Sequence, residues 1–137
     1  IAKDGEGATK LIECRVKGAR SVKSARNVAK SVIKSSLVKA AMFGADANWG
    51  RVLCAIGYSG ERVDPYRIDV CFGSAAGEIC VCRDGRGVEF DEDKAKKVLS
   101  EDEVTIDVDL GSGRYGATAW GCDLTYDYVR INGDYRT

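Results

Sequence analysis

Histidine is absent from this sequence of 137 residues. Its absence removes the commonest general base, the Ser–His and Cys–His catalytic pairs, and every mixed Cys/His zinc site. Any acid–base chemistry must therefore fall to Asp, Glu, Lys, Tyr, Cys or a chain terminus. The sequence also lacks an excess of either charge, because 21 basic residues balance 21 acidic ones, and this argues against a dedicated nucleic-acid binder. No apolar run approaches the roughly 20 residues that a membrane span requires.

Cysteine is better represented, and its pattern predicts free thiols. Five of the six cysteines lie inside apolar, strand-like runs, where free cysteine behaves as a small core hydrophobe. Cys80 and Cys82 do not form a CxxC pair, and in a strand their side chains point to opposite faces. We therefore predict no structural disulfide and no metal site. The six are Cys14, Cys54, Cys71, Cys80, Cys82 and Cys122.

The remaining pattern predicts a single α+β domain over residues 1–137, with helices packed on a largely antiparallel sheet. Apolar residues alternate over Val104–Leu110, as in a half-buried strand, and recur every three or four residues after Ser21, as in a helix. There is no internal repeat and no linker. We predict strands at 10–16, 51–58, 67–72, 78–83, 88–90, 104–110, 115–124 and 128–135, and helices at 21–34, 36–43 and 91–99.

Two conspicuous stretches have both a functional and a structural interpretation. Residues 20–39 contain six basic residues and no acidic one, which fits either a phosphate or nucleic-acid patch or a solvated helix face. No aromatic residues interleave with the basic ones, which favours the solvated face. Residues 46–51 contain Asp, Asn, Trp and Gly in one turn. On physical grounds a structural role is favoured over a functional one there too.

Both ends of the chain contain residues suited to binding a small polar molecule. Glu6 lies between two glycines, so a ligand can approach the backbone closely and its ammonium group can pair with the carboxylate. Tyrosine and isoleucine continue a strand pattern over 126–135, which predicts an ordered terminus. Such a terminus can present the Asn132 amide, the Thr137 hydroxyl and the terminal carboxylate.

Four stretches, taken in order, resemble the family of bifunctional glutamate/ornithine N-acetyltransferases. They are Asp4–Lys10, Phe43–Arg51, Ala117–Val129 and Tyr135–Thr137. The resemblance covers essentially the whole chain, and four long motifs in sequence are far more specific than a lone Gly-x-Gly.

The resemblance implies an N-terminal-nucleophile-like α/β sandwich enzyme of arginine biosynthesis. Such a precursor cuts itself before a threonine to give an α chain and a β chain, and the new N-terminal threonine is the nucleophile. It takes acetyl from N-acetylornithine and passes it to glutamate through an acyl-enzyme. A threonine hydroxyl activated by its own α-amine needs no histidine, in agreement with the composition.

By this resemblance, the chain is the C-terminal part of the β chain. Its first residue is Ile1, so we expect it to begin inside a longer polypeptide, downstream of the cleavage point and without the nucleophile. No catalytic residue is then expected in this chain. The family's substrate-binding positions that carry over are Glu6, Asn132 and Thr137, with Glu6 assigned to the substrate's ammonium group.

The implied setting is a cytoplasmic hetero-oligomer, a heterotetramer or larger, in which this chain joins the α chain and the upstream part of the β chain. The substrates would be N-acetylornithine, glutamate and ornithine. No cofactor, metal, membrane or nucleic acid is expected, and the use of acetyl-CoA as a second donor stays open. The alternatives are a non-catalytic α+β interaction domain and a nucleic-acid module built on the basic helix.

Overall fold

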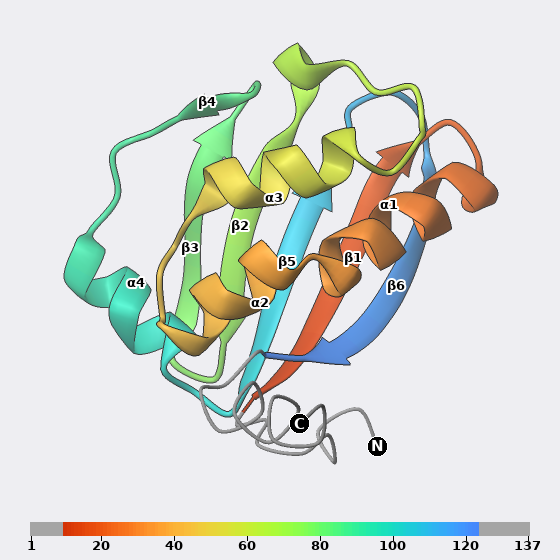
Figure 1. The fold of residues 1–137 in the computed structure, drawn as a ribbon. Helices are drawn as coiled ribbons and strands as arrows, with labels where there is room; N and C mark the ends of the chain where they lie inside the picture. Colours follow the sequence, from red (N-terminus) through yellow and green to blue (C-terminus); the bar gives the residue numbers. More distant parts are fainter. Residues whose placement is uncertain (1–9, 124–137) are drawn as a thin grey trace, which may run out of the picture.

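The computed structural model describes residues 10–123 and shows one six-stranded sheet with helices on it (Figure 1). The strands are β1 (Leu11–Ala19), β2 (Asp69–Ser74), β3 (Gly77–Arg83), β4 (Arg86–Gly87), β5 (Glu103–Asp109) and β6 (Tyr115–Cys122). The helices are α1 (Val22–Lys34), α2 (Ser36–Phe43), α3 (Trp49–Gly57) and α4 (Glu92–Leu99), with a short 3₁₀ helix, η2 (Pro65–Arg67).

The sheet is mixed and mostly antiparallel. Its strand order is β4-β3-β2-β5-β1-β6. Only β1 and β5 pair in parallel among the described strands, whereas β1 with β6, β2 with β5, β2 with β3 and β3 with β4 pair antiparallel. The predicted α+β class with a largely antiparallel sheet is therefore confirmed.

The two faces of the sheet differ in polarity because side chains alternate along each strand. The inward positions of the central strands are apolar and buried, and Figure 1 shows α1, α2 and α3 lying across that face. The opposite face has polar and charged side chains at the intervening positions. The inward residues are Ile12, Cys14, Val16, Val70, Phe72, Val104, Ile106 and Val108.

The first two helices end and begin where the sequence predicts. The Ser21 side chain accepts a hydrogen bond from the Ser24 amide and caps α1. Ser35 has an extended backbone conformation that ends α1, and its hydroxyl accepts from the Val38 amide to start α2. These local bonds satisfy amides that a helix leaves without partners at its N-terminus.

The predicted strand at 51–58 is wrong, because this segment forms most of α3. The Asn48 side chain caps the helix by accepting from the Arg51 amide at 3.1 Å. Val52, Ala55 and Ile56 are buried, at spacings of three and one, and together they form one helical face against the sheet. The run is as apolar as a buried strand, but the Asn48 cap and the spacing of its buried residues favour a helix.

The second half of the sheet brings two further corrections. The predicted strand at 88–90 is replaced by the two-residue β4, which follows a turn at Asp84 and Gly85, both with positive φ. The prediction of no disulfide is also wrong, because Cys71 and Cys80 are bonded. They face each other across the β2–β3 hairpin, a pairing that depends on strand register and not on the spacing of nine residues.

Two further sequence predictions concern the C-terminal strand and membrane-spanning helices. The strand predicted at 128–135 lies outside the described residues. None of the helices within 10–123 is long and apolar enough to cross a membrane.

Candidate functional site

The three predicted substrate-binding residues, Glu6, Asn132 and Thr137, all lie outside the described residues 10–123. The structure therefore gives no geometry for them. It does show the first and last described residues, Lys10 immediately before β1 and Asp123 immediately after β6.

Lys10 and Asp123 are hydrogen-bonded to each other in both directions. The Lys10 amide donates to Asp123 Oδ1 at 2.9 Å, and the Asp123 amide donates to the Lys10 carbonyl at 3.2 Å. Both residues are buried, with 7% and 3% of their surface exposed. The first and the last described residues of the chain therefore lie side by side.

The Lys10 ammonium is held by the C-terminal ends of two helices. It donates to the Met42 carbonyl of α2 at 2.5 Å and to the Leu99 carbonyl of α4 at 2.6 Å. Carbonyls at a helix C-terminus lack partners within the helix and attract a cation. Burial lowers the pKa of this ammonium, and the negative charges of Asp123 and Asp102 oppose that change.

The turn at 46–51 has a structural role in the described residues. Asn48 caps α3, as described above, and Arg51 donates from Nη1 to the Leu37 carbonyl at 3.0 Å, which ties α3 to α2. The Trp49 ring lies against Gly87. These contacts favour the structural interpretation of the turn at 46–51, which the sequence also favours.

The basic residues of α1 point away from the core. Lys23, Arg26, Lys30 and Lys34 are all exposed, whereas the buried residues of this helix are apolar or small. An open groove runs beside them, and its wall includes Trp120 from β6. One exposed aromatic residue does not make a stacking platform for nucleic acid, so the geometry favours the solvated face.

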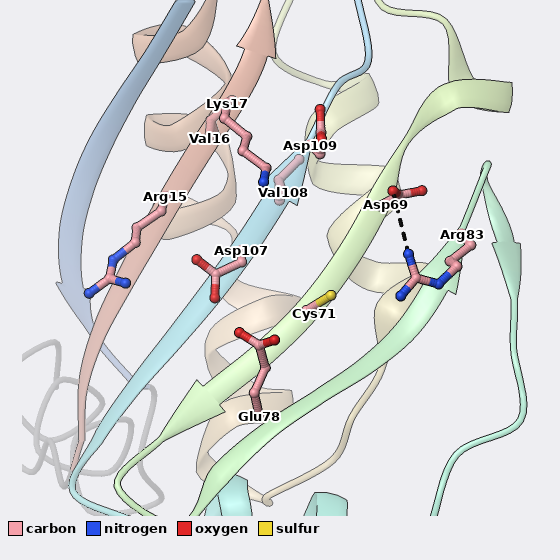
Figure 2. Close-up of a pocket in the computed structure, with 10 residues that line it drawn as sticks. All are labelled: Arg15, Val16, Lys17, Asp69, Cys71, Glu78, Arg83, Asp107, Val108 and Asp109. Carbon is pink, nitrogen blue, oxygen red and sulfur yellow. Dashed lines mark ion pairs between the residues drawn. The ribbon is translucent and has the colours of Figure 1, made fainter.

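A broad cavity of about 350 Å³ lies on the polar face of the sheet, away from α1–α3 (Figure 2). Its side chains come from four neighbouring strands, β1, β5, β2 and β3, and Figure 2 shows the carboxylates of Asp107 and Glu78 turned toward each other beside Cys71. Positive and negative groups are mixed, with Arg83 lying 3.9 Å from Asp69. The lining residues are Arg15, Val16, Lys17, Asp69, Cys71, Glu78, Arg83, Asp107, Val108 and Asp109.

Two titratable groups on or beneath this face have shifted pKa values. Burial raises the pKa of the Asp107 carboxyl, against the effect of a hydrogen bond from Thr105. Burial also raises the pKa of the Cys14 thiol to about 12, so the thiol stays protonated and is a poor nucleophile. Cys71 is in a disulfide. Residues 10–123 contain no cluster of acidic or cysteine side chains able to hold a metal ion.

Lys10 and Asp123 belong to the stretches that resemble the acetyltransferase family, but the sequence alone predicts no role for either residue. A signal for Lys10 was present. Lys10 lies two residues before Ile12, and Ile12, Cys14 and Val16 occupy alternate positions that face the core. The same alternation places the Lys10 side chain on the buried face of the strand. A charged residue at a buried position needs partners. The partners themselves come from α2, α4 and β6, and only the fold reveals them.

Comparison with known proteins gives a consistent result along the whole chain. The model of the ArgJ family matches residues 1–137. Arginine biosynthesis bifunctional protein ArgJ 1 of Clostridium acetobutylicum is 58% identical over 137 residues, which are all of this chain and 34% of that protein. Glutamate N-acetyltransferase of Methanosarcina mazei is 51% identical over 138 residues, covering all of this chain and 35% of that protein.

A solved structure has the same fold. The crystal structure of arginine biosynthesis bifunctional protein argJ from Bacillus halodurans matches with a TM-score of 0.91 and 51% identity, covering 98% of this chain and 62% of that one. The chain thus spans about a third of the length of the curated relatives that it matches.

Proposed function

Because this chain belongs to the ArgJ family, we propose that it forms part of an acetyltransferase that moves acetyl from N-acetylornithine to glutamate in arginine biosynthesis. The observation behind this proposal is the match of the family model along all 137 residues. It is supported by the names of the relatives, which include a bifunctional arginine-biosynthesis protein and a glutamate N-acetyltransferase.

The chain's share of the work would be substrate binding. Glu6 would pair with the substrate's ammonium group, and Asn132 and Thr137 would bind its polar ends. The hydrogen bonds between Lys10 and Asp123 support this arrangement. They bring together the residue that follows the Glu6 stretch and the residue that precedes the C-terminal stretch. Glu6 is only four residues from Lys10 in the sequence.

The nucleophile would be an N-terminal threonine in the upstream part of the β chain. Its hydroxyl attacks the acetyl carbonyl of N-acetylornithine, and ornithine leaves with a proton on its freed amine. The α-amine of glutamate then attacks the acyl ester, which releases N-acetylglutamate and restores the hydroxyl. This division agrees with the chain's lack of histidine and with the protonated, buried state of Cys14.

The partners proposed for this chain are the α chain and the upstream part of the β chain, in a hetero-oligomer that is a heterotetramer or larger. The cytoplasmic location and the choice of donors beyond N-acetylornithine stay predictions.

An assay of acetyl transfer tests the proposal. The complete protein is incubated with N-acetylornithine and glutamate, and N-acetylglutamate is measured by mass spectrometry. We expect turnover by the complete protein and none by the purified 137-residue chain. A complete protein that forms no N-acetylglutamate would contradict the proposed function, and turnover by the isolated chain would contradict the placement of the nucleophile upstream.

A further inference from the structure

The Cys71–Cys80 disulfide lies on the polar face of the sheet, where solvent can reach it. Both cysteines are half-buried, and Cys71 lines the broad cavity of about 350 Å³ on that face (Figure 2). By contrast, Cys14 and Cys82 are buried free thiols. A sulfur of the disulfide is therefore within reach of a small reagent in the folded protein.

The strands that carry the two cysteines are held together without this bond. β2 pairs with β3 on both sides of Cys71, and it also pairs with β5 along its other edge. The bond joins residues only nine positions apart, and a cross-link that closes a short loop stabilises a fold less than one that closes a long loop. Reduction should therefore leave the hairpin paired, with the two thiols still opposite each other and able to bond again.

Strand register sets the direction from which a thiolate can attack this bond. Cys71 lies opposite Cys80 on β3 and opposite Asp107 on β5, so Asp107 is on the side of Cys71 away from Cys80. A thiolate attacks a disulfide sulfur from the side opposite the sulfur that leaves. The approach to Cys71 therefore passes the Asp107 carboxylate, with Glu78 beside it in the same cavity (Figure 2).

We propose that Cys71–Cys80 is a redox-active site that dithiols without negative charge of their own reduce in the folded protein. One thiolate of the dithiol bonds to the Cys71 sulfur, the Cys71–Cys80 bond breaks, and the Cys80 thiolate takes up a proton. The second thiol then attacks the mixed disulfide, which frees Cys71 as a thiol and leaves the reagent as a disulfide. Two electrons and two protons pass to the protein, and a disulfide of the same class reverses the reaction.

The surroundings of the bond favour this role over a purely structural one. In the cytoplasm, where we predict this protein to act, disulfides are usually transient, catalytic or redox-sensing. The carboxylates of Asp107 and Glu78 repel an attacking reagent that carries a further negative charge, and so favour neutral and cationic reagents. The exchange does not depend on the acetyl transfer proposed above.

The first test follows reduction of the native, complete protein by dithiothreitol. Samples are quenched with acid and alkylated after denaturation, and the labels on Cys71 and Cys80 are measured by peptide mass spectrometry. Val28→Ala is compared with wild type, because it leaves a cavity under α1 on the other face of the sheet and lowers the stability of the fold.

We expect both proteins to be reduced at rates within about two-fold of each other, because native attack does not depend on unfolding. Reduction that is about ten-fold faster in Val28→Ala would show that the bond reacts only after the fold opens, and would overturn the proposal. Should Val28→Ala not fold, Ile56→Val, which leaves a smaller cavity, takes its place.

The second test examines the direction of attack with two monothiols at about pH 8, cationic cysteamine and anionic 2-mercaptoethanesulfonate. We expect the mixed disulfide to form on Cys71 and cysteamine to react faster. Asp107→Asn should narrow the ratio of the two rates about two- to five-fold, whereas Glu89→Gln, at an exposed position outside the cavity, should leave it unchanged. Attachment mainly to Cys80, or a wild-type ratio in Asp107→Asn, would overturn attack through the cavity.

Discussion

Trp49 and Gly87 lie in such close contact that a β-carbon added to Gly87 would come 2.5 Å from Cζ2 of the Trp49 ring. The contact joins the start of α3 to the short edge strand β4. It explains the tryptophan in the turn at 46–51 by packing, without a ligand. The absence of a side chain at Gly87 is what allows the ring to lie there.

We therefore predict that Gly87→Ala destabilises the protein. The new methyl group must push the Trp49 ring aside, and overpacking of this kind typically costs about 1–3 kcal/mol. Chemical denaturation of wild type and variant measures the difference in the free energy of unfolding. Gly57→Ala is a matched control, since its added β-carbon meets nothing within 4 Å apart from its chain neighbours and its own helix backbone, and alanine is the better helix former. Equal stability of wild type and Gly87→Ala would show that the ring moves freely.

The free cysteines should differ sharply in reactivity. Cys14 is buried and its pKa is raised to about 12, and burial also raises the pKa of Cys82, whereas Cys54 is exposed. Since the thiolate is the reactive form, iodoacetamide at about pH 8 should label Cys54 in the native protein and leave Cys14 and Cys82 unmodified. Peptide mass spectrometry gives the site of each label.

The control for this experiment is denatured protein without reductant. There all four free cysteines should react, and Cys71 and Cys80 should react only after reduction, because they are bonded. Fast native labelling of Cys14 would contradict its burial. Labelling of all six cysteines in freshly prepared, denatured protein without reductant would contradict the disulfide.

Asp107 should weaken the fold at neutral pH. Burial raises its pKa in the folded state above 3.8, so the folded state binds a proton more readily than the unfolded state. The contribution of Asp107 to stability therefore falls as pH rises from about 3.8 through its raised folded pKa, and then levels off. We predict that Asp107→Asn is more stable than wild type at neutral pH, and that the difference shrinks toward acid pH.

Urea denaturation at a series of pH values checks this prediction. Asp93→Asn is a control of opposite sign, because Asp93 lies in the first turn of α4 and losing a carboxylate there should cost about 0.3–1 kcal/mol. A wild type that equals or exceeds Asp107→Asn in stability at neutral pH would show that the carboxylate is better solvated or better paired than its burial indicates.

Local signals predicted most of this fold. The helices predicted at 21–34 and 36–43 form α1 and α2, capped by Ser21 and Ser35, and the alternation at 104–110 becomes β5 almost residue for residue. The strand predicted at 51–58 is a helix because a short apolar run fits either a buried strand or a buried helix, so the cap at Asn48 is the better evidence.

Features that depend on register could not be predicted in the same way. Cys71 meets Cys80 only because the β2–β3 hairpin pairs them. Lys10 meets Asp123 across 113 positions of sequence. The substrate-binding assignments of Glu6, Asn132 and Thr137 came from motif resemblance, and they remain predictions.

The substrate-binding role of Glu6 is the part of this account most open to direct test. Glu6 lies between two glycines, so we expect little effect on packing from Glu6→Gln. Losing a charge-assisted hydrogen bond to the substrate's ammonium group typically costs about 1.5–3 kcal/mol. That cost corresponds to roughly a ten- to hundred-fold loss in kcat/KM. Removal of Thr137 should act in the same direction.

The decisive measurement is steady-state kinetics of the complete enzyme with N-acetylornithine and glutamate, alongside thermal melting. The control is Glu89→Gln, a change of the same chemistry at an exposed position of the described fold. Our account predicts a kcat/KM at least about ten-fold lower for Glu6→Gln, with the melting temperature of wild type and an unchanged Glu89→Gln. A kcat/KM within about two-fold of wild type, or a melting temperature that falls as steeply as the activity, would contradict it.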